Sequence, residues 1–181
     1  HVFEASGQMA AELQALDLSK EDAGGSVMRP AVARDNMIRA QLASRTQAGL
    51  RLGRYGEAEQ AARQRLALPP NPMSEFDPQD EISRTQVMLA RALIGQGRRD
   101  EAREILDVEL PRYRRLQEQG AQGLSFRRDL AQALYVDAIA RPAQDRQRAA
   151  ALGTARDTLD GLPAEARQLL DIRELYAQIA A

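Results

Sequence analysis

Paired carboxylates are the residues of this chain that come closest to acid–base machinery. They occur as Asp100-Glu101, as Glu104 with Asp107, and as Glu57 with Glu59. A general acid–base pair needs a cleft and a shifted pKa. These pairs instead stand near the expected starts of helices, where a carboxylate offsets the helix dipole. We therefore expect them to stabilise helices rather than to catalyse a reaction.

Nucleophiles and metal ligands are scarce in the sequence. There is no Cys, and the single His is residue 1. The chain therefore offers no disulfide, no thiolate nucleophile and no Cys-built metal site, and it cannot assemble a Ser-His-Asp triad by itself. Gly95-Gln96-Gly97 superficially resembles a phosphate-binding loop, but no predicted strand precedes it. We expect no enzyme activity, no cofactor and no metal site, although an Asp/Arg/Tyr active site is left open.

Arginine supplies nearly all of the positive charge, because Lys20 is the only lysine among 25 basic residues. Two clusters, Arg112 with Arg114 and Arg115, and Arg127-Arg128, flank an expected loop at 117–124. Guanidinium forks suit carboxylates, so one interpretation is an acidic peptide partner. The alternative is a solvated surface with local ion pairs. The 26 acidic residues balance the charge, and aromatic side chains do not interleave with the arginines, so nucleic acid is not an expected partner.

The elements that must position these side chains are predicted to be helices. The chain is rich in Ala, Leu, Arg, Gln and Glu, which favour helix, and its aromatic content is only 4%. Apolar periodicity and Pro or Gly breaks predict helices over residues 5–17, 30–52, 57–68, from Asp77-Pro78 or Asp80 to Gly95, from an N-cap at Asp100 to Gly120 with a kink or break at Pro111, and over 125–140, 145–160 and 164–180. The sequence thus predicts an all-α protein.

Three segments of the sequence recur. Leu89-Ala90-Arg91-Ala92-Leu93 returns as Leu130-Ala131-Gln132-Ala133-Leu134. The stretch 53–59 (GRYGEAE) matches 97–103 (GRRDEAR), and 102–107 (AREILD) matches 155–160 (ARDTLD). The repeated order is a helix, a glycine turn and a second helix, which is typical of helical repeat proteins.

At these residues the chain resembles the tetratricopeptide repeat family. The matching positions are Leu89, Ala90, Gly97 and Ala102 in the middle unit, Gly53, Tyr55 and Ala58 in the first, and Leu130, Ala131 and Ala155 in the third. The resemblance implies a right-handed α-α superhelix of helical hairpins over residues 27–181. Residues 164–180 would then be a cap helix with one apolar stripe, formed by Leu169, Ile172, Tyr176 and Ile179. Residues 1–26 would form an N-terminal helix and linker of uncertain role.

The chain also departs from that family. Ala58 and Ala102 are 44 residues apart, and Ala102 and Ala155 are 53 apart, whereas the usual period is about 34. The helices or their connections must therefore be longer than usual.

The resemblance also implies a function, because tetratricopeptide arrays bind ligands on their concave face. Carried over by register, this face would hold Arg84, Val87, Arg91, Ile94, Arg128, Gln132, Tyr135, Gln47 and Arg51. We expect a non-catalytic scaffold or adaptor domain of a larger bacterial protein, which binds another protein or a peptide with acidic side chains. One alternative is a regulatory domain that senses a small effector within the array, and self-association into a homodimer is left open.

The compartment is not decided by the sequence. No run of about 20 apolar residues exists, so direct membrane insertion is not expected. Absence of Cys fits the bacterial cytoplasm and periplasm equally well. The chain begins at His1 rather than Met, which leaves open whether a leader or another domain precedes it.

Overall fold

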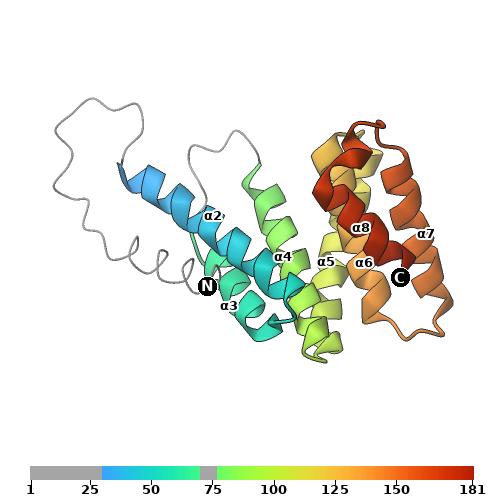
Figure 1. Cartoon of the computed structure of the whole chain (residues 1–181), viewed down its shortest axis with the longest axis horizontal. Helices are drawn as coiled ribbons and strands as arrows, with labels where there is room; N and C mark the ends of the chain where they lie inside the picture. Colours follow the sequence, from blue (N-terminus) through green and yellow to red (C-terminus); the bar gives the residue numbers. More distant parts are fainter. Residues whose placement is uncertain (1–29, 70–76) are drawn as a thin grey trace. The chain divides into compact units, whose positions relative to one another are not determined.

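The computed structural model describes residues 30–69 and 77–181, and these residues form helices joined by turns, with no strand among them (Figure 1). The prediction of an all-α protein is therefore confirmed. The chain divides into two compact units, His1–Gln96 and Gly97–Ala181, which are called the first and the second unit below. The helix expected at 5–17 and the linker that follows it lie outside the described residues.

The first unit is built from α2 (Pro30–Arg51), α3 (Tyr55–Leu66) and α4 (Pro78–Gly95). α3 packs against both α2 and α4, and α2 also contacts α4 (Figure 1). Two clusters of buried side chains hold the three helices together. One consists of Ile38, Leu42 and Ala61, and the other of Leu50, Ala58, Met88 and Ala92.

The two repeated stretches, 53–59 and 97–103, each begin with the predicted glycine turn. Gly53 has a φ of 69° and Gly97 a φ of 80°, in the left-handed region that glycine tolerates best. The residue after each glycine then takes nearly the same backbone conformation, with φ −85° and ψ 62° at Arg54 and φ −85° and ψ 59° at Arg98. A helix begins directly afterwards in both places, so the same residues make the same turn twice.

Small residues bring the helices of the first unit close together. A side chain added at Gly49 would lie 3.0 Å from the Cβ atom of Ala58, and one added at Gly95 would stand inside the van der Waals surface of the Tyr55 ring. Across the described residues, fully buried alanines recur at such positions: Ala58, Ala61, Ala62, Ala90, Ala92, Ala102, Ala131, Ala133, Ala138 and Ala155. The core therefore depends on close backbone approach as much as on large side chains.

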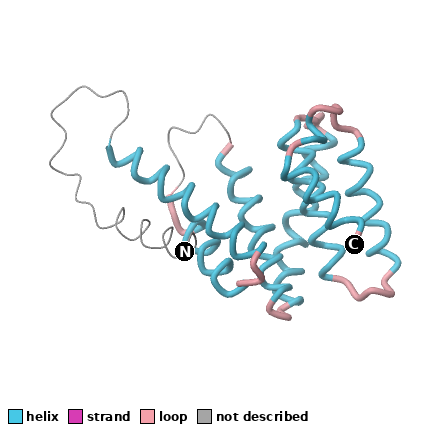
Figure 2. Tube along the Cα trace, in the orientation of Figure 1, coloured by secondary structure: helices cyan, strands magenta, loops and turns pink. Residues whose placement is uncertain are grey.

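The second unit contains α5 (Arg99–Glu118), α6 (Leu124–Ala140), α7 (Arg146–Asp160), a 3-10 turn η1 (Ala166–Gln168) and α8 (Leu170–Ala180). α6 is its central element and contacts α5, α7 and α8. Figure 2 shows the helices as cyan tubes joined by pink loops and turns. The rings of Tyr113 and Phe126 meet between α5 and α6 with their centroids 6.2 Å apart. This tilted ring pair is a favourable aromatic arrangement.

Asp residues cap two of the helices. Asp77 accepts a hydrogen bond from the backbone N–H of Gln79, so the predicted start at Asp77-Pro78 is confirmed for α4. Asp145 does the same for Gln147 at the start of α7. Each bond satisfies an N–H that the helix itself leaves without a partner.

Two predictions about α5 are wrong. Asp100 is not the N-cap, because the glycine turn brings the chain into the helix two residues earlier and Arg98 takes the capping position. Pro111 does not break the helix, which continues to Glu118. Leu110 and Tyr113 are buried on either side of Pro111. Burial of apolar side chains along the same helix face outweighs the backbone hydrogen bond that proline removes.

The terminal helix was predicted correctly only in part. Instead of one helix over 164–180, η1 is followed by α8, and Leu169 between them is extended, with φ −61° and ψ 139°. Ile172 and Leu175 are buried, but the Leu169 side chain is 46% exposed. Leu169 therefore lies outside the helical stripe in which the spacing had placed it.

A tyrosine–carboxylate hydrogen bond fastens α8 to α7. The hydroxyl of Tyr176 donates to Oδ1 of Asp160 at 2.7 Å. Burial raises the pKa of Tyr176 to about 12, and the hydrogen bond to Asp160 and the charge of Asp160 add to the shift. Because the protonated phenol is favoured in the folded state, this stabilisation is fully present below the unfolded pKa of about 10 and is lost as the pH rises through about 12.

We expect Asp160→Asn to move the pKa of Tyr176 down from about 12 towards its ordinary value. Tyrosinate absorbance during an alkaline titration measures this, and Tyr176→Phe identifies which of the four tyrosines the transition belongs to. Asp107→Asn, at an exposed position of α5, should leave the transition in place. An unchanged Tyr176 transition in Asp160→Asn would show that the hydrogen bond does not contribute.

None of the helices within residues 30–69 and 77–181 combines the length and the apolar character that crossing a bilayer requires.

Candidate functional site

The α4 residues of the predicted partner face lie on one strip of the helix, in a part of it, residues 83–93, that is mostly buried. Arg84, Arg91 and Ile94 are half-buried, whereas Val87 is only 2% exposed. The buried residues of α4 are Ser83, Thr85, Val87, Met88, Leu89, Ala90, Ala92 and Leu93. Val87 is therefore part of the core, and it is not available to a partner as the spacing had suggested.

The α2 residues of the predicted face are freely accessible. Gln47 and Arg51 are both exposed and stand one helical turn apart near the C-terminal end of α2. α2 and α4 belong to the same unit and touch each other. The first unit thus carries five accessible or half-accessible members of the predicted set: Gln47, Arg51, Arg84, Arg91 and Ile94.

The remaining predicted residues are in the second unit, on α6. Arg128, Gln132 and Tyr135 are all half-buried. Nη1 of Arg128 lies 3.3 Å from Asp171 of α8, and Nε lies 3.1 Å from Asp129. Burial alone would lower the pKa of Arg128, but these two acids outweigh it, so the pKa is raised. Arg128 is already paired within its own unit, and a partner would have to compete with both carboxylates.

The basic cluster at 127–128 is likewise used within the second unit. Arg127 donates to the backbone carbonyl oxygen of Gly161 at 2.7 Å and to that of Gln122 at 3.0 Å. These bonds join the start of α6 to the turn after α7. Both arginines of this cluster therefore have structural partners, which favours the interpretation of local pairing over that of an open surface for an acidic partner.

A polar cluster that the sequence analysis missed lies in the first unit, where α2, α3 and α4 meet. Nη1 of Arg39 on α2 is 3.4 Å from Oε1 of Glu81 on α4, and Nη2 of Arg65 on α3 is 3.2 Å from the same oxygen. Arg65 also donates to the hydroxyl of Thr85 at 3.1 Å. Arg39 donates to the backbone carbonyl oxygen of Pro69. We call Arg39, Arg65 and Glu81 the arginine pair cluster.

The charges of this cluster do not balance. Both arginine side chains are only 11% exposed, and Glu81 is 28% exposed. Among the described residues, Glu81 is the only acid that pairs with either guanidinium. Burial is the largest influence on Arg65 and lowers its pKa; Glu81 opposes this, while the positive charges of Arg84 and Arg39 lower the pKa further. The cluster therefore holds more positive charge than its own carboxylate neutralises.

One sequence signal could have revealed the cluster. Arg39, Leu42, Thr46 and Leu50 follow one another at helical spacings of three and four, and all four are buried. An arginine in such an apolar stripe cannot reach solvent freely, so it requires a partner inside the fold. The identity of that partner was hidden, because Glu81 lies 42 positions further along the chain.

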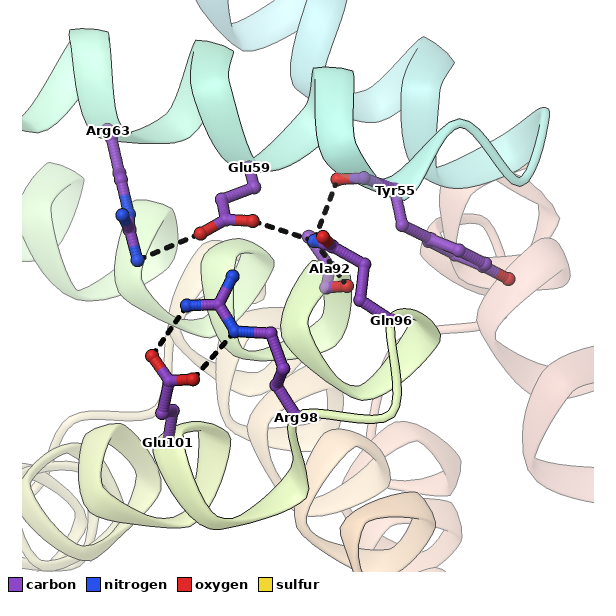
Figure 3. Close-up of polar contacts among 7 residues, drawn as sticks. All are labelled: Tyr55, Glu59, Arg63, Ala92, Gln96, Arg98 and Glu101. Carbon is purple, nitrogen blue, oxygen red and sulfur yellow. Dashed lines mark hydrogen bonds and ion pairs between the residues drawn. The ribbon is translucent and has the colours of Figure 1, made fainter.

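The buried carboxylate of Glu59 belongs to another polar cluster of the first unit (Figure 3). Glu59 on α3 accepts from Nε2 of Gln96 at 2.7 Å and from Nη2 of Arg63 at 2.8 Å. Gln96 is the C-cap of α4, so this contact holds the end of α4 against α3. Figure 3 also shows the two-bond fork of Arg98 onto Glu101 in the first turn of α5, with both bonds at 2.6 Å. These contacts join side chains of the chain to one another, and we interpret them as structural.

Within the part of the chain that the structure describes, no three His, Cys, Asp or Glu side chains gather as metal ligands would. The paired carboxylates of α5 lie at its surface. Asp100, Glu101, Glu104 and Asp107 are all exposed, and so they lack the enclosed cleft that an acid–base pair needs.

Comparisons of the chain with protein-family models, with curated proteins and with solved structures found no match. Its function must therefore be inferred from the geometry of its own residues.

Proposed function

We propose that this chain is a protein-interaction module, a scaffold or adaptor built from helical hairpins similar to tetratricopeptide repeats, with no catalytic activity of its own. In this proposal residues 27–181 form the repeat array, and α8 is its C-terminal cap. The partner is a protein or peptide segment with acidic side chains. The observation that carries the proposal is the strip on α4, where two arginines are half-accessible within residues 83–93, a stretch that is otherwise mostly buried.

The physical basis of the proposal is the rigidity of that strip. The buried residues between positions 83 and 93 hold this part of the α4 backbone in place, so little backbone freedom is lost when a ligand binds. Ile94 adds a half-buried apolar contact one turn further. Arginine favours planar carboxylates through paired hydrogen bonds. Gln47 and Arg51 on α2 extend the same chemistry.

The direct test is selection of random displayed peptides on the immobilised chain, followed by fluorescence anisotropy with one selected peptide. We expect selected peptides to be enriched in Asp and Glu. Arg91→Glu should weaken binding by at least about 100-fold, because it replaces an attraction by a like-charge repulsion. Circular dichroism checks that this variant keeps its helical fold.

The matched control is Arg103→Glu, which makes the same change at an exposed position of α5. It should bind the selected peptide like the wild type. If Arg91→Glu also binds normally, α4 does not carry the partner site. If no peptide is selected above background, the interaction function itself is wrong.

A further inference from the structure

The arginine pair cluster presents two cations to a single carboxylate oxygen. Arg39 and Arg65 both approach Oε1 of Glu81, at 3.4 and 3.2 Å. The two guanidinium groups are therefore close neighbours although they repel each other. Such an arrangement is stable only when sufficient negative charge lies nearby. Glu81 supplies one negative charge against two positive ones.

The hydrogen-bonding capacity of the two arginines is also incompletely used. Each guanidinium carries five N–H donors in a fixed fork. The Nη atoms contact Glu81, Thr85 and the carbonyl oxygen of Pro69. The Nε atoms of Arg39 and Arg65 are both buried and have no hydrogen-bond acceptor among the described residues. Buried donors without acceptors are rare in folded proteins, and each is costly.

One kind of ligand would both balance the charge and accept hydrogen bonds from the Nε donors, namely a small anion. From these observations we propose that Arg39 and Arg65 form a binding site for a small oxyanion, a phosphate or carboxylate group, where α2, α3 and α4 meet. Two guanidinium forks match the oxygens of such groups in geometry and in charge. The positive charge of Arg84, which is felt at Arg65, strengthens the attraction.

The site differs from the strip on α4 in what it can admit. Both arginine side chains are nearly buried, each with 11% exposed, so a ligand that reaches them has to be small. The inference therefore goes beyond the proposed interaction function. A ligand here would cross-link three helices that come from different parts of the first unit, and it would stabilise that unit by binding only the folded state.

The experiment is thermal unfolding in chloride buffer, with inorganic phosphate or acetate added at constant ionic strength. We expect the melting temperature of the wild type to rise with phosphate and to reach a plateau, as binding to one site requires. General salting-in or salting-out effects change linearly and do not reach a plateau in this range. Saturation with acetate as well would assign a general oxyanion site, and saturation with acetate alone would assign a carboxylate site.

Arg65→Met should remove the plateau, whereas Arg156→Met on α7 should retain it. A response that is linear, or equal in the wild type and in Arg65→Met, would overturn the proposal. Should Arg65→Met fail to fold, Glu81→Gln decides the question, because it keeps both arginines and removes the competing carboxylate. It should bind phosphate about tenfold more tightly than the wild type, as expected when one nearby negative charge is removed. Equal or weaker binding in Glu81→Gln would also overturn the proposal.

Discussion

Glu81→Gln is expected to lower the free energy of unfolding by about 3 kcal/mol in chloride buffer, because it leaves two buried guanidinium groups without a counter-charge. Gln has nearly the same size as Glu, so the change tests charge and not packing. The remaining amide oxygen still accepts one hydrogen bond, but it does not offset the repulsion between Arg39 and Arg65. Urea unfolding followed by circular dichroism gives the free energy directly.

The control for this substitution is Glu104→Gln, at an exposed position of α5. Surface changes of this kind usually alter the free energy of unfolding by no more than about 0.5 kcal/mol. If Glu81→Gln and Glu104→Gln have the same small effect, Glu81 does not hold the arginines in place. The proposed oxyanion site adds a further expectation, since phosphate should restore more stability to Glu81→Gln than to the wild type.

Gly95→Ala is expected to destabilise the chain by about 2 kcal/mol, because its new methyl group would overlap the Tyr55 ring. Tyr55 packs against the buried cluster that includes Leu50 and Met88, so its ring cannot move away without disturbing that cluster. Alanine favours helix over glycine by about 1 kcal/mol. The expected net loss already includes this gain. Urea unfolding is again the measurement.

A double-mutant cycle with Tyr55→Ala separates the steric effect from other consequences of Gly95→Ala. Once the ring is gone, the methyl group has space. The loss of stability in the double mutant should therefore be smaller than the sum of the two single losses, by about 1 kcal/mol or more. Gly153→Ala is the matched control, since nothing lies within 4 Å of a Cβ atom there, and it should be neutral or stabilising. Simple additivity in the cycle would contradict the assigned contact.

The parts of the fold that could be predicted are those whose cause is local. The glycine turns at Gly53 and Gly97 were predicted because a left-handed backbone position has few alternatives to glycine. The start of α4 at Asp77-Pro78 was predicted because an Asp cap and a first-turn proline act within one turn of helix. Periodicity located all the helices of the described residues to within a few positions, apart from the terminal segment.

The predictions that failed depended on contacts distant in the sequence. Helix α5 tolerates Pro111 because side chains on both sides of it are buried, and burial is a tertiary property. Leu169 has the spacing of an apolar stripe, but the backbone becomes extended there. Val87 has the same spacing as Arg84 and Arg91, yet it faces the core. A spacing rule identifies residues on one helix face, but it does not say which neighbour covers part of that face.

The candidate sites also differ in whether local or distant contacts form them. On α4 the structure leaves Arg84, Arg91 and Ile94 half-buried, and their role in binding a partner stays a prediction. The arginine pair cluster was not predicted, because its three members come from three helices and none of the pairs is within one helix. The convergence of Arg39, Arg65 and Glu81 exists only after the helices have packed.

The fully buried alanines have a consequence for how this chain can diverge in sequence. A buried leucine can be exchanged for isoleucine or methionine at small cost, because neighbouring side chains adjust to a similar volume. An alanine between two closely packed backbones cannot be enlarged without separating them, as the contact of Ala58 with Gly49 illustrates. Distant descendants of this protein would therefore keep a pattern of small residues while their larger apolar residues drift. Relatives would be recognised by the spacing of their alanines and glycines, more than by any shared leucine or aromatic signature.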